Sequence, residues 1–122
     1  MAIDVLLADD LAFIRNVLRD TLSGAGFNVV GEAGTGEEAI ELFAETRPDV
    51  VLMDITMPRM DGLDALRAIR AADDSACVIM CTALGQERLI SEAIGAGARD
   101  FIVKPFTPDR VVAAVKTVLN IG

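Results

Sequence analysis

The chain has 122 residues, of which 52% are apolar and 25% charged, and its 19 acidic and 11 basic residues give a net charge of −8. This length suits one domain with a proper core, and no segment reaches the roughly eighteen uninterrupted apolar residues of a membrane helix. The acidic balance argues against a DNA-binding surface, which needs a basic face. The N-terminus, MAIDVLLADD, lacks the basic segment of a secretory signal. We therefore expect a cytoplasmic protein that binds neither nucleic acid nor membrane.

Strand and helix patterns alternate along the whole chain. Short apolar runs rich in β-branched residues predict strands at residues 3–8, 27–32, 50–53, 77–81 and 100–103. An amphipathic segment follows each run. In the first of these segments, Phe13, Val17 and Leu18 are spaced for one helix face, which Leu22 continues. Five β–α units predict an α/β fold with one doubly wound, five-stranded parallel sheet, helices on both faces and a single domain.

Two of the predicted helices have clear start signals. Thr35 can cap a helix, with Glu38 three residues later in a capping-box arrangement. Thr107 is followed by Pro108 at the first helical position, which suits the fixed φ of proline. The segment GEAGTG around Thr35 lacks the Gly-Lys-Ser/Thr ending of a phosphate-binding loop, so we interpret it as a turn.

The two cysteines, Cys77 and Cys81, lie in the predicted strand CVIMC. In a strand they point to the same face about 13 Å apart, at about 3.3 Å per residue. A disulfide needs Cα atoms within about 7 Å, so these two cannot bridge each other there. A zinc site would need two further ligands, and the chain has no histidine. We predict that both are small core residues.

Polar side chains follow most of the predicted strands. The apolar run 50–53 ends at Asp54, although burying a lone carboxylate costs several kcal/mol or more. Asp9 and Asp10 follow the first strand, Thr82 the fourth and Lys104 the fifth. Each of these alone has an ordinary interpretation as a helix cap or a solvated charge. Because ligands bind beyond the carboxyl ends of strands in open α/β sheets, we expect all five to share one edge.

Three carboxylates on one edge require a cation. Two of them about 4 Å apart repel by roughly 4 kcal/mol at an effective dielectric constant of 20. Oxygen ligands without histidine suit Mg²⁺, which needs one or two carboxylates plus water and phosphate oxygens. A carboxylate beside Mg²⁺ can attack phosphorus and form an acyl phosphate. Mg²⁺, the Lys104 ammonium and the Thr82 hydroxyl can then each take one phosphoryl oxygen, with Asp54 as the acceptor.

Four motifs give a family resemblance over essentially all 122 residues. ADD, DITMPRMDG, CTALG and DFIVKPF occur in the order and at the approximate spacing of response-regulator receiver domains. The chain most closely resembles the stand-alone chemotaxis regulators of the CheY type. The resemblance implies a flavodoxin-like, CheY-like sheet of order 2-1-3-4-5, and one receiver domain spanning residues 1–122.

The resemblance also assigns roles to residues. It implies that Asp54 is the phosphoacceptor and that Asp9, Asp10 and Asp54 bind Mg²⁺ together with the Thr56 backbone carbonyl. It implies that Thr82 is the switch hydroxyl.

Three further implications concern the fifth strand and its end. Lys104 is the lysine that senses the phosphoryl group, and the Lys104–Pro105 peptide is expected to be cis. The family's switch aromatic falls on Phe101, which has no hydroxyl, so the coupling mechanism departs from the pattern that a tyrosine would give.

These implications predict a phosphorylation-activated switch of a two-component system. A sensor histidine kinase is the expected phosphodonor, and the protein catalyses only its own phosphorylation and dephosphorylation. The surface that changes should comprise residues 86–96 and 99–120. The expected partner is a flagellar motor switch protein, with a phosphatase as a further partner. The alternative is a receiver domain cut from a longer transcription factor or enzyme.

Two other classes of protein share parts of this pattern. An aspartate-nucleophile phosphatase of the haloacid dehalogenase kind would also use Asp54 and Mg²⁺, but it needs a second acid where Thr56 stands. A flavodoxin-like cofactor binder would need hydroxyls and glycines after the first strand. The segment ADDLAFIR instead offers two carboxylates, which repel a phosphate.

Overall fold

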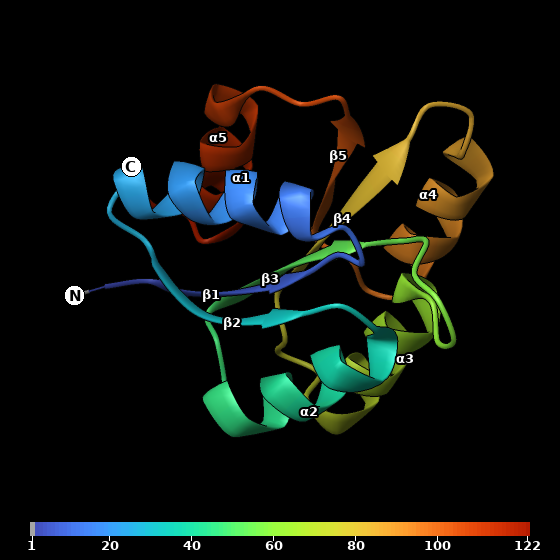
Figure 1. The fold of residues 1–122 in the computed structure, drawn as a ribbon. Helices are drawn as coiled ribbons and strands as arrows, with labels where there is room; N and C mark the ends of the chain where they lie inside the picture. The colour runs from blue at the N-terminus through green and yellow to red at the C-terminus, as the bar shows by residue number, and fades with distance from the viewer. Residues whose placement is uncertain (1) are drawn as a thin grey trace.

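The computed structural model describes residues 2–122, in which five strands and five helices alternate (Figure 1). The strands are β1 (Asp4–Ala8), β2 (Asn28–Ala33), β3 (Val50–Asp54), β4 (Val78–Ala83) and β5 (Asp100–Lys104). The helices are α1 (Ala12–Gly24), α2 (Gly36–Thr46), α3 (Gly62–Ala72), α4 (Glu87–Gly95) and α5 (Pro108–Val118). Within residues 2–122, no helix combines the length and the apolar character that crossing a bilayer requires.

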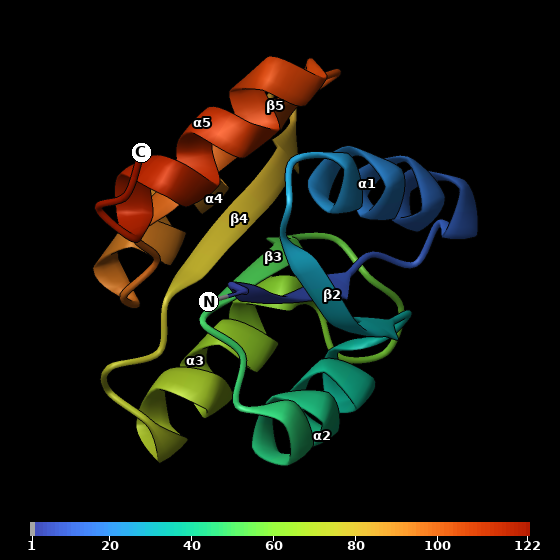
Figure 2. The same cartoon turned by 90° about the vertical axis from the view of Figure 1, so that its left-hand side faces the viewer.

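The strands form one parallel sheet of order β2-β1-β3-β4-β5. Helices α1 and α5 cover one face, and α2, α3 and α4 cover the other, as Figures 1 and 2 show from two sides. The predicted doubly wound fold and its strand order are therefore confirmed. In a sheet of this order all five strands end at the same edge, which gathers the residues that follow them.

The last three strands run one or two residues further than the sequence pattern predicts. Asp54 pairs with Cys81 in the ladder between β3 and β4, and Thr82 pairs with Val103 between β4 and β5. Ladder hydrogen bonds involve only the backbone, so a polar residue can occupy a strand position when its side chain has a polar destination. Asp54, Thr82 and Lys104 thus project from the sheet itself, whereas Asp9 and Asp10 follow the end of β1.

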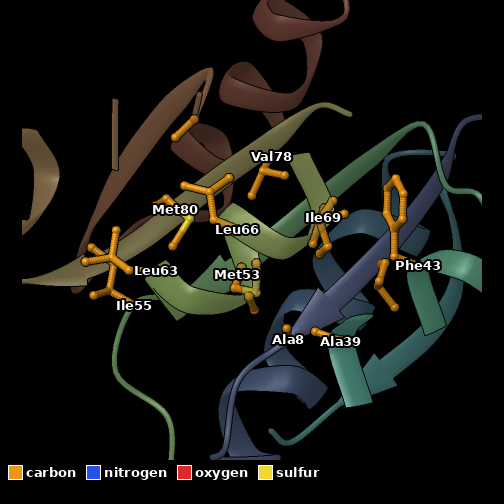
Figure 3. Close-up of a cluster of buried hydrophobic side chains, with 14 of the residues drawn as sticks. Ala8, Ala39, Phe43, Met53, Ile55, Leu63, Leu66, Ile69, Val78 and Met80 are labelled. Carbon is orange, nitrogen blue, oxygen red and sulfur yellow. The ribbon is translucent and has the colours of Figure 1, made fainter. Parts of the chain in front are cut away.

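Two apolar layers hold the helices to the sheet. Figure 3 shows the layer under α2 and α3, where Phe43, Leu66 and Ile69 belong to one buried cluster with the strand residues Met53 and Met80. The opposite layer joins α1 and α5 to the sheet and includes Leu18, Leu22, Ile79, Ile102, Val111 and Val115. Each fully buried large side chain contributes about 1.5–3 kcal/mol. Both predicted core cysteines are buried and free.

The predicted face of α1 is only half correct. Leu18 and Leu22 are buried, but Phe13 is 73% exposed and Val17 is also exposed. Leu18 and Leu22 face the sheet, whereas Phe13 and Val17 lie on another side of the helix. The apolar stripe of α1 is therefore wider than its contact with the sheet. The predicted caps are correct: Thr35 accepts from the Glu38 N–H, and Thr107 accepts from the Arg110 N–H.

Candidate functional site

The carboxyl edge of the sheet brings the predicted side chains together. Asp9 and Asp10 directly follow β1, Asp54 ends β3, Thr82 lies near the end of β4, and Lys104 ends β5. Asp9, Asp54 and Thr82 are the buried polar residues of the described chain, whereas Asp10 is exposed.

One ammonium group holds two buried carboxylates. The Lys104 Nζ lies 3.0 Å from Asp9 Oδ2 and 3.0 Å from Asp54 Oδ2. Asp9 is 2% exposed and Asp54 8% exposed, whereas the Lys104 side chain is 21% exposed, so both ion pairs are partly shielded from water. Such charge-assisted hydrogen bonds are about twice as strong as neutral ones. The charge nevertheless does not balance, because one cation faces two carboxylates with a third, Asp10, nearby.

This imbalance is visible in the acid–base properties. Burial raises the pKa of Asp54, the Lys104 ammonium opposes that rise, and the neighbouring Asp9 carboxylate adds to it, so the net shift is upward. For Lys104, burial alone would lower the pKa, but the hydrogen bonds to Asp9 and Asp54 outweigh it, and the net shift is upward. The lysine is therefore held as a cation, while the ionised form of Asp54 is disfavoured.

Asp9 is fixed in place by its surroundings. Its Oδ1 accepts from the Leu11 N–H at 2.9 Å, and its own N–H donates to the Ala33 carbonyl at 2.9 Å. Its backbone carbonyl accepts from Arg15 Nη1 at 2.6 Å, and Arg15 pairs with Glu32 on β2 at 3.4 Å. Arg15 and Glu32 could not be predicted as neighbours of the site, since no local pattern distinguishes them from ordinary charges beside a helix and a strand.

The backbone around Asp54 is fixed by a close approach of α3. A Cβ atom on Gly62 would lie 2.0 Å from the Asp54 carbonyl oxygen, so only glycine fits there. The Gly62 N–H donates to the Ile55 carbonyl at 2.7 Å. Asp61 then caps α3 by accepting from the Asp64 N–H. The start of α3 is therefore pinned against the end of β3.

The three carboxylates form a cluster that could hold a metal ion. Oxygen atoms of Asp9, Asp10 and Asp54 all lie within 4.8 Å of one another. A set of oxygen donors with excess negative charge suits a small hard cation. The residues present thus fit the predicted ion. The contribution of the Thr56 carbonyl stays a prediction.

The side chain of Gln86, which was not among the predicted site residues, binds Thr82. The Thr82 hydroxyl is fully buried and lies 2.9 Å from Gln86 Oε1. The same oxygen accepts from the Ala83 N–H at 2.9 Å, and Gln86 Nε2 donates to Thr56 Oγ1 at 3.1 Å. The position of Gln86 depends on the turn at Gly85, which has a φ of +91°. The one sequence feature that could have pointed to Gln86 is its position as a polar residue directly before α4.

The remaining predicted residues lie as follows. Phe101 is half-buried on β5, opposite Met80 of β4, and its backbone carbonyl accepts from Arg110 Nη2 at 2.9 Å. The predicted cis peptide between Lys104 and Pro105 is present. The role of Phe101 as a switch stays a prediction.

A surface hollow lies beside the site. It has a volume of about 390 Å³, and Lys104 contributes to its wall. The other lining residues are apolar: Phe13, Ile14, Val17, Pro105 and Phe106. The exposed side of α1 is therefore an apolar surface next to the acidic cluster.

Comparisons with known proteins show which chains this protein resembles. The family model of the response regulator receiver domain matches residues 5–116. The chain is 53% identical to a chemotaxis protein CheY of Thermotoga maritima over 114 residues, covering 93% of this chain and 95% of that protein. It is 51% identical to a chemotaxis protein CheY of Bacillus subtilis over 120 residues, covering 98% and 100%. Among solved structures, a chain of the CheX–CheY–BeF₃–Mg²⁺ complex from Borrelia burgdorferi matches with a TM-score of 0.91 and 39% identity, covering 95% of this chain and 88% of that one.

Proposed function

The chain belongs to the response regulator receiver domain family, and from this premise we propose that it is a phosphorylation-activated switch whose acceptor is Asp54. The observation that carries this proposal is the pair of buried carboxylates, Asp9 and Asp54, held by one Lys104 ammonium at the sheet edge. We further propose that residues 1–122 form one receiver domain, of which Met1 lies outside the described residues.

The proposed reaction is a phosphoryl transfer from a phosphohistidine of a sensor kinase. A carboxylate oxygen of Asp54 attacks phosphorus, an O–P bond forms, and the N–P bond to the donor imidazole breaks. The imidazole nitrogen leaves with the electron pair and takes up a proton. Catalysis in such a transfer rests on positioning and charge stabilisation, which the rigid ends of β1, β3 and β5 supply. The protein would therefore catalyse only its own phosphorylation and, with water, its dephosphorylation.

Asp9, Asp10 and Asp54, with the Thr56 backbone carbonyl, would hold Mg²⁺. When bound, the ion neutralises the excess negative charge of the carboxylates and of the incoming phosphoryl oxygens. Lys104 already lies within hydrogen-bond distance of Asp54 and would bind a phosphoryl oxygen. Thr82, from the neighbouring strand, would donate its hydroxyl to another. These groups take part in the transition state as well as in the product.

We propose that the output surface is formed by α4, β5 and α5. Phosphorylation adds charge at one end of β3, and the segment around Thr82 and Phe101 shifts in population in response. Leu84, before α4, is 77% exposed, and Ile94 on α4 is also exposed, so this region offers apolar contacts to a partner. Since the relatives above are chemotaxis proteins, we propose a chemotaxis output with a flagellar motor switch protein as the partner.

The apolar hollow suits the phosphodonor. It adjoins Lys104, and the exposed Phe13 and Val17 extend it along α1. A kinase segment packed there would place its phosphohistidine near Asp54. A phosphatase is a further proposed partner.

Intact-protein mass spectrometry after incubation with acetyl phosphate tests the proposal. We expect one phosphoryl adduct on the wild type that requires Mg²⁺ and is absent from Asp54→Asn. The matched control is Asp20→Asn, which changes a carboxylate that is 81% exposed on α1 and should keep the adduct. An adduct on Asp54→Asn, or none on a folded wild type with Mg²⁺, would overturn the assignment.

A further inference from the structure

We propose that Gln86 is a positioning residue that keeps the Thr82 hydroxyl away from the phosphoryl site until Asp54 is phosphorylated. The inference rests on the proposed function. Its basis is a three-way contact of one carboxamide: Oε1 accepts from both the Thr82 hydroxyl and the Ala83 N–H, and Nε2 donates to Thr56 Oγ1. We call this arrangement the Gln86 clasp.

The clasp competes directly with phosphoryl binding. A threonine hydroxyl has one proton to donate, and here the acceptor at 2.9 Å is Gln86 Oε1. To donate to a phosphoryl oxygen, Thr82 must first release Gln86. The new bond is charge-assisted and therefore stronger, so the phosphoryl group wins the competition, but the released bond reduces its apparent affinity. The clasp thus sets the threshold of the switch.

The clasp also bridges the loops that follow β3 and β4. Gln86 belongs to the loop after β4, and Thr56 belongs to the loop after β3. The Thr56 N–H in turn lies 3.3 Å from Asp54 Oδ1. A change at the Asp54 carboxylate can therefore reach Gln86 through Thr56, and a phosphoryl group that binds the Thr82 hydroxyl would reach Gln86 through Thr82.

Gln86 connects this contact to α4. It directly precedes the helix, and its backbone carbonyl accepts from the Leu89 N–H at 3.0 Å and the Ile90 N–H at 3.2 Å. The side chain thus contacts the site while the backbone begins the helix. Opening the clasp would free the first turn of α4 at the proposed output surface.

The link between Thr82 and Gln86 matters because position 101 is a phenylalanine in this chain. Phe101 has no hydroxyl, so its ring can respond to a displaced Thr82 only by packing. Within the described residues, the Thr82 hydroxyl has two polar contacts: the backbone carbonyl of the adjacent Ala83 and the side chain of Gln86. Gln86 therefore supplies the polar part of the coupling that Phe101 cannot.

Titration calorimetry with beryllofluoride and Mg²⁺ tests the clasp. Beryllofluoride is a stable mimic of a phosphoryl group, and it is present in the Borrelia complex. Gln86→Met keeps the length of the side chain and removes its hydrogen bonds. We expect it to bind beryllofluoride about fivefold more tightly than wild type, the factor for one ordinary hydrogen bond. We also expect its Tm to fall, because the free state loses its contacts.

The opposite signs of these two changes separate a clasp from a merely structural role. A structural residue would lower the Tm and leave the affinity equal or weaker, and that result would overturn the proposal. The matched control is Thr46→Val, which removes one hydroxyl hydrogen bond to Leu42 at the far end of α2 and should lower stability without changing the affinity. If Gln86→Met does not fold, Thr56→Val decides, since it removes the anchor at Nε2 and should also tighten binding.

Amide hydrogen exchange gives the second measurement. The Leu89 and Ile90 amides should exchange faster in free Gln86→Met than in free wild type, and wild type should approach the rate of the variant once beryllofluoride binds. Equal exchange in the two free proteins would count against the link to α4. A wild type that binds no beryllofluoride would instead refute the proposed function, so the two failures are distinguishable.

Discussion

The middle and the carboxyl end of β3 differ sharply within one strand. Val50–Met53 are apolar and almost completely buried, and the next residue, Asp54, is a carboxylate that is nearly as buried. Burial of the apolar side chains stabilises the folded state. Burial destabilises the ionised form of Asp54, and this raises its pKa. Both the apolar residues and Asp54 are buried because of their position in the fold, but only the burial of the apolar residues stabilises it.

The two regions also differ in how their neighbours matter. A core residue such as Leu66 contacts many side chains, each of which contributes a little. Asp54 depends on a few specific groups, above all the Lys104 ammonium at 3.0 Å. The core should therefore tolerate changes that conserve volume, whereas the site should respond to the charge of a single atom.

Truncation in the core should produce the largest effect. Leu66 is fully buried between α3 and the sheet (Figure 3), and Leu66→Ala should lower the free energy of unfolding by about 3 kcal/mol. Urea denaturation followed by circular dichroism measures this change. Leu84→Ala is the control, because Leu84 is exposed and its loss should change stability by about 0.5 kcal/mol or less. Equal losses in the two variants would contradict the assignment of the core.

The residues that could be predicted from the sequence and those that could not follow the same division. The parallel order brings every strand end to one edge, so Asp54, Thr82 and Lys104 could be grouped before any distance was known. Their neighbours Arg15 and Gln86 could not be grouped. The contacts of these two depend on rotamers and on the turn at Gly85, which no periodic pattern encodes.

The helix faces show where periodicity stops being informative. On α3, Leu63, Leu66 and Ile69 are all buried, as the spacing predicts. On α1 the apolar stripe is wider than the contact with the sheet, and Phe13 lies outside it. Hydropathy alone does not say which part of a wide stripe packs, because that choice depends on the crossing angle of the helix.

Removing the cation should produce the second largest effect. Lys104→Met leaves two buried carboxylates without their counter-ion. Because Lys104 is partly exposed, we expect a loss of about 2 kcal/mol in the free energy of unfolding without Mg²⁺, between the values for exposed and fully buried pairs. Adding Mg²⁺ should recover more stability in this variant than in wild type, because no ammonium competes for the same oxygens. Parallel urea titrations with and without Mg²⁺ measure both effects.

Lys116→Met provides the comparison for this variant. Lys116 is exposed on α5, so its replacement should change neither the stability nor the response to Mg²⁺. A Lys104→Met protein as stable as wild type in the absence of Mg²⁺ would show that the two carboxylates do not need the ammonium.

Removing the charge of the acceptor should have a smaller effect of the opposite sign. In Asp54→Asn the amide keeps the shape of the side chain but ends the repulsion with Asp9. Since the ionised form of Asp54 is disfavoured in the folded protein, we expect a gain of about 1 kcal/mol near neutral pH without Mg²⁺. Thermal denaturation of this variant beside Asp20→Asn measures the gain, and a Tm below that of wild type would contradict it.

The smallest effect concerns an acid in a different environment. Asp73, at the end of α3, accepts from the Ser75 hydroxyl at 2.6 Å and from the Ser75 N–H at 3.0 Å, and these bonds lower its pKa below 3.8. A lowered pKa in the folded state means that this contribution to stability is present above pH 3.8 and is lost as the pH falls through the folded-state value. Ser75→Ala removes the hydroxyl bond, so the Asp73 pKa should rise towards 3.8 in a carboxyl NMR titration. An unchanged pKa would assign the shift to the backbone N–H alone. The half-buried Asp73 carboxylate, with two donors from Ser75, is thus stabilised as an anion, whereas burial at the sheet edge disfavours the ionised form of Asp54.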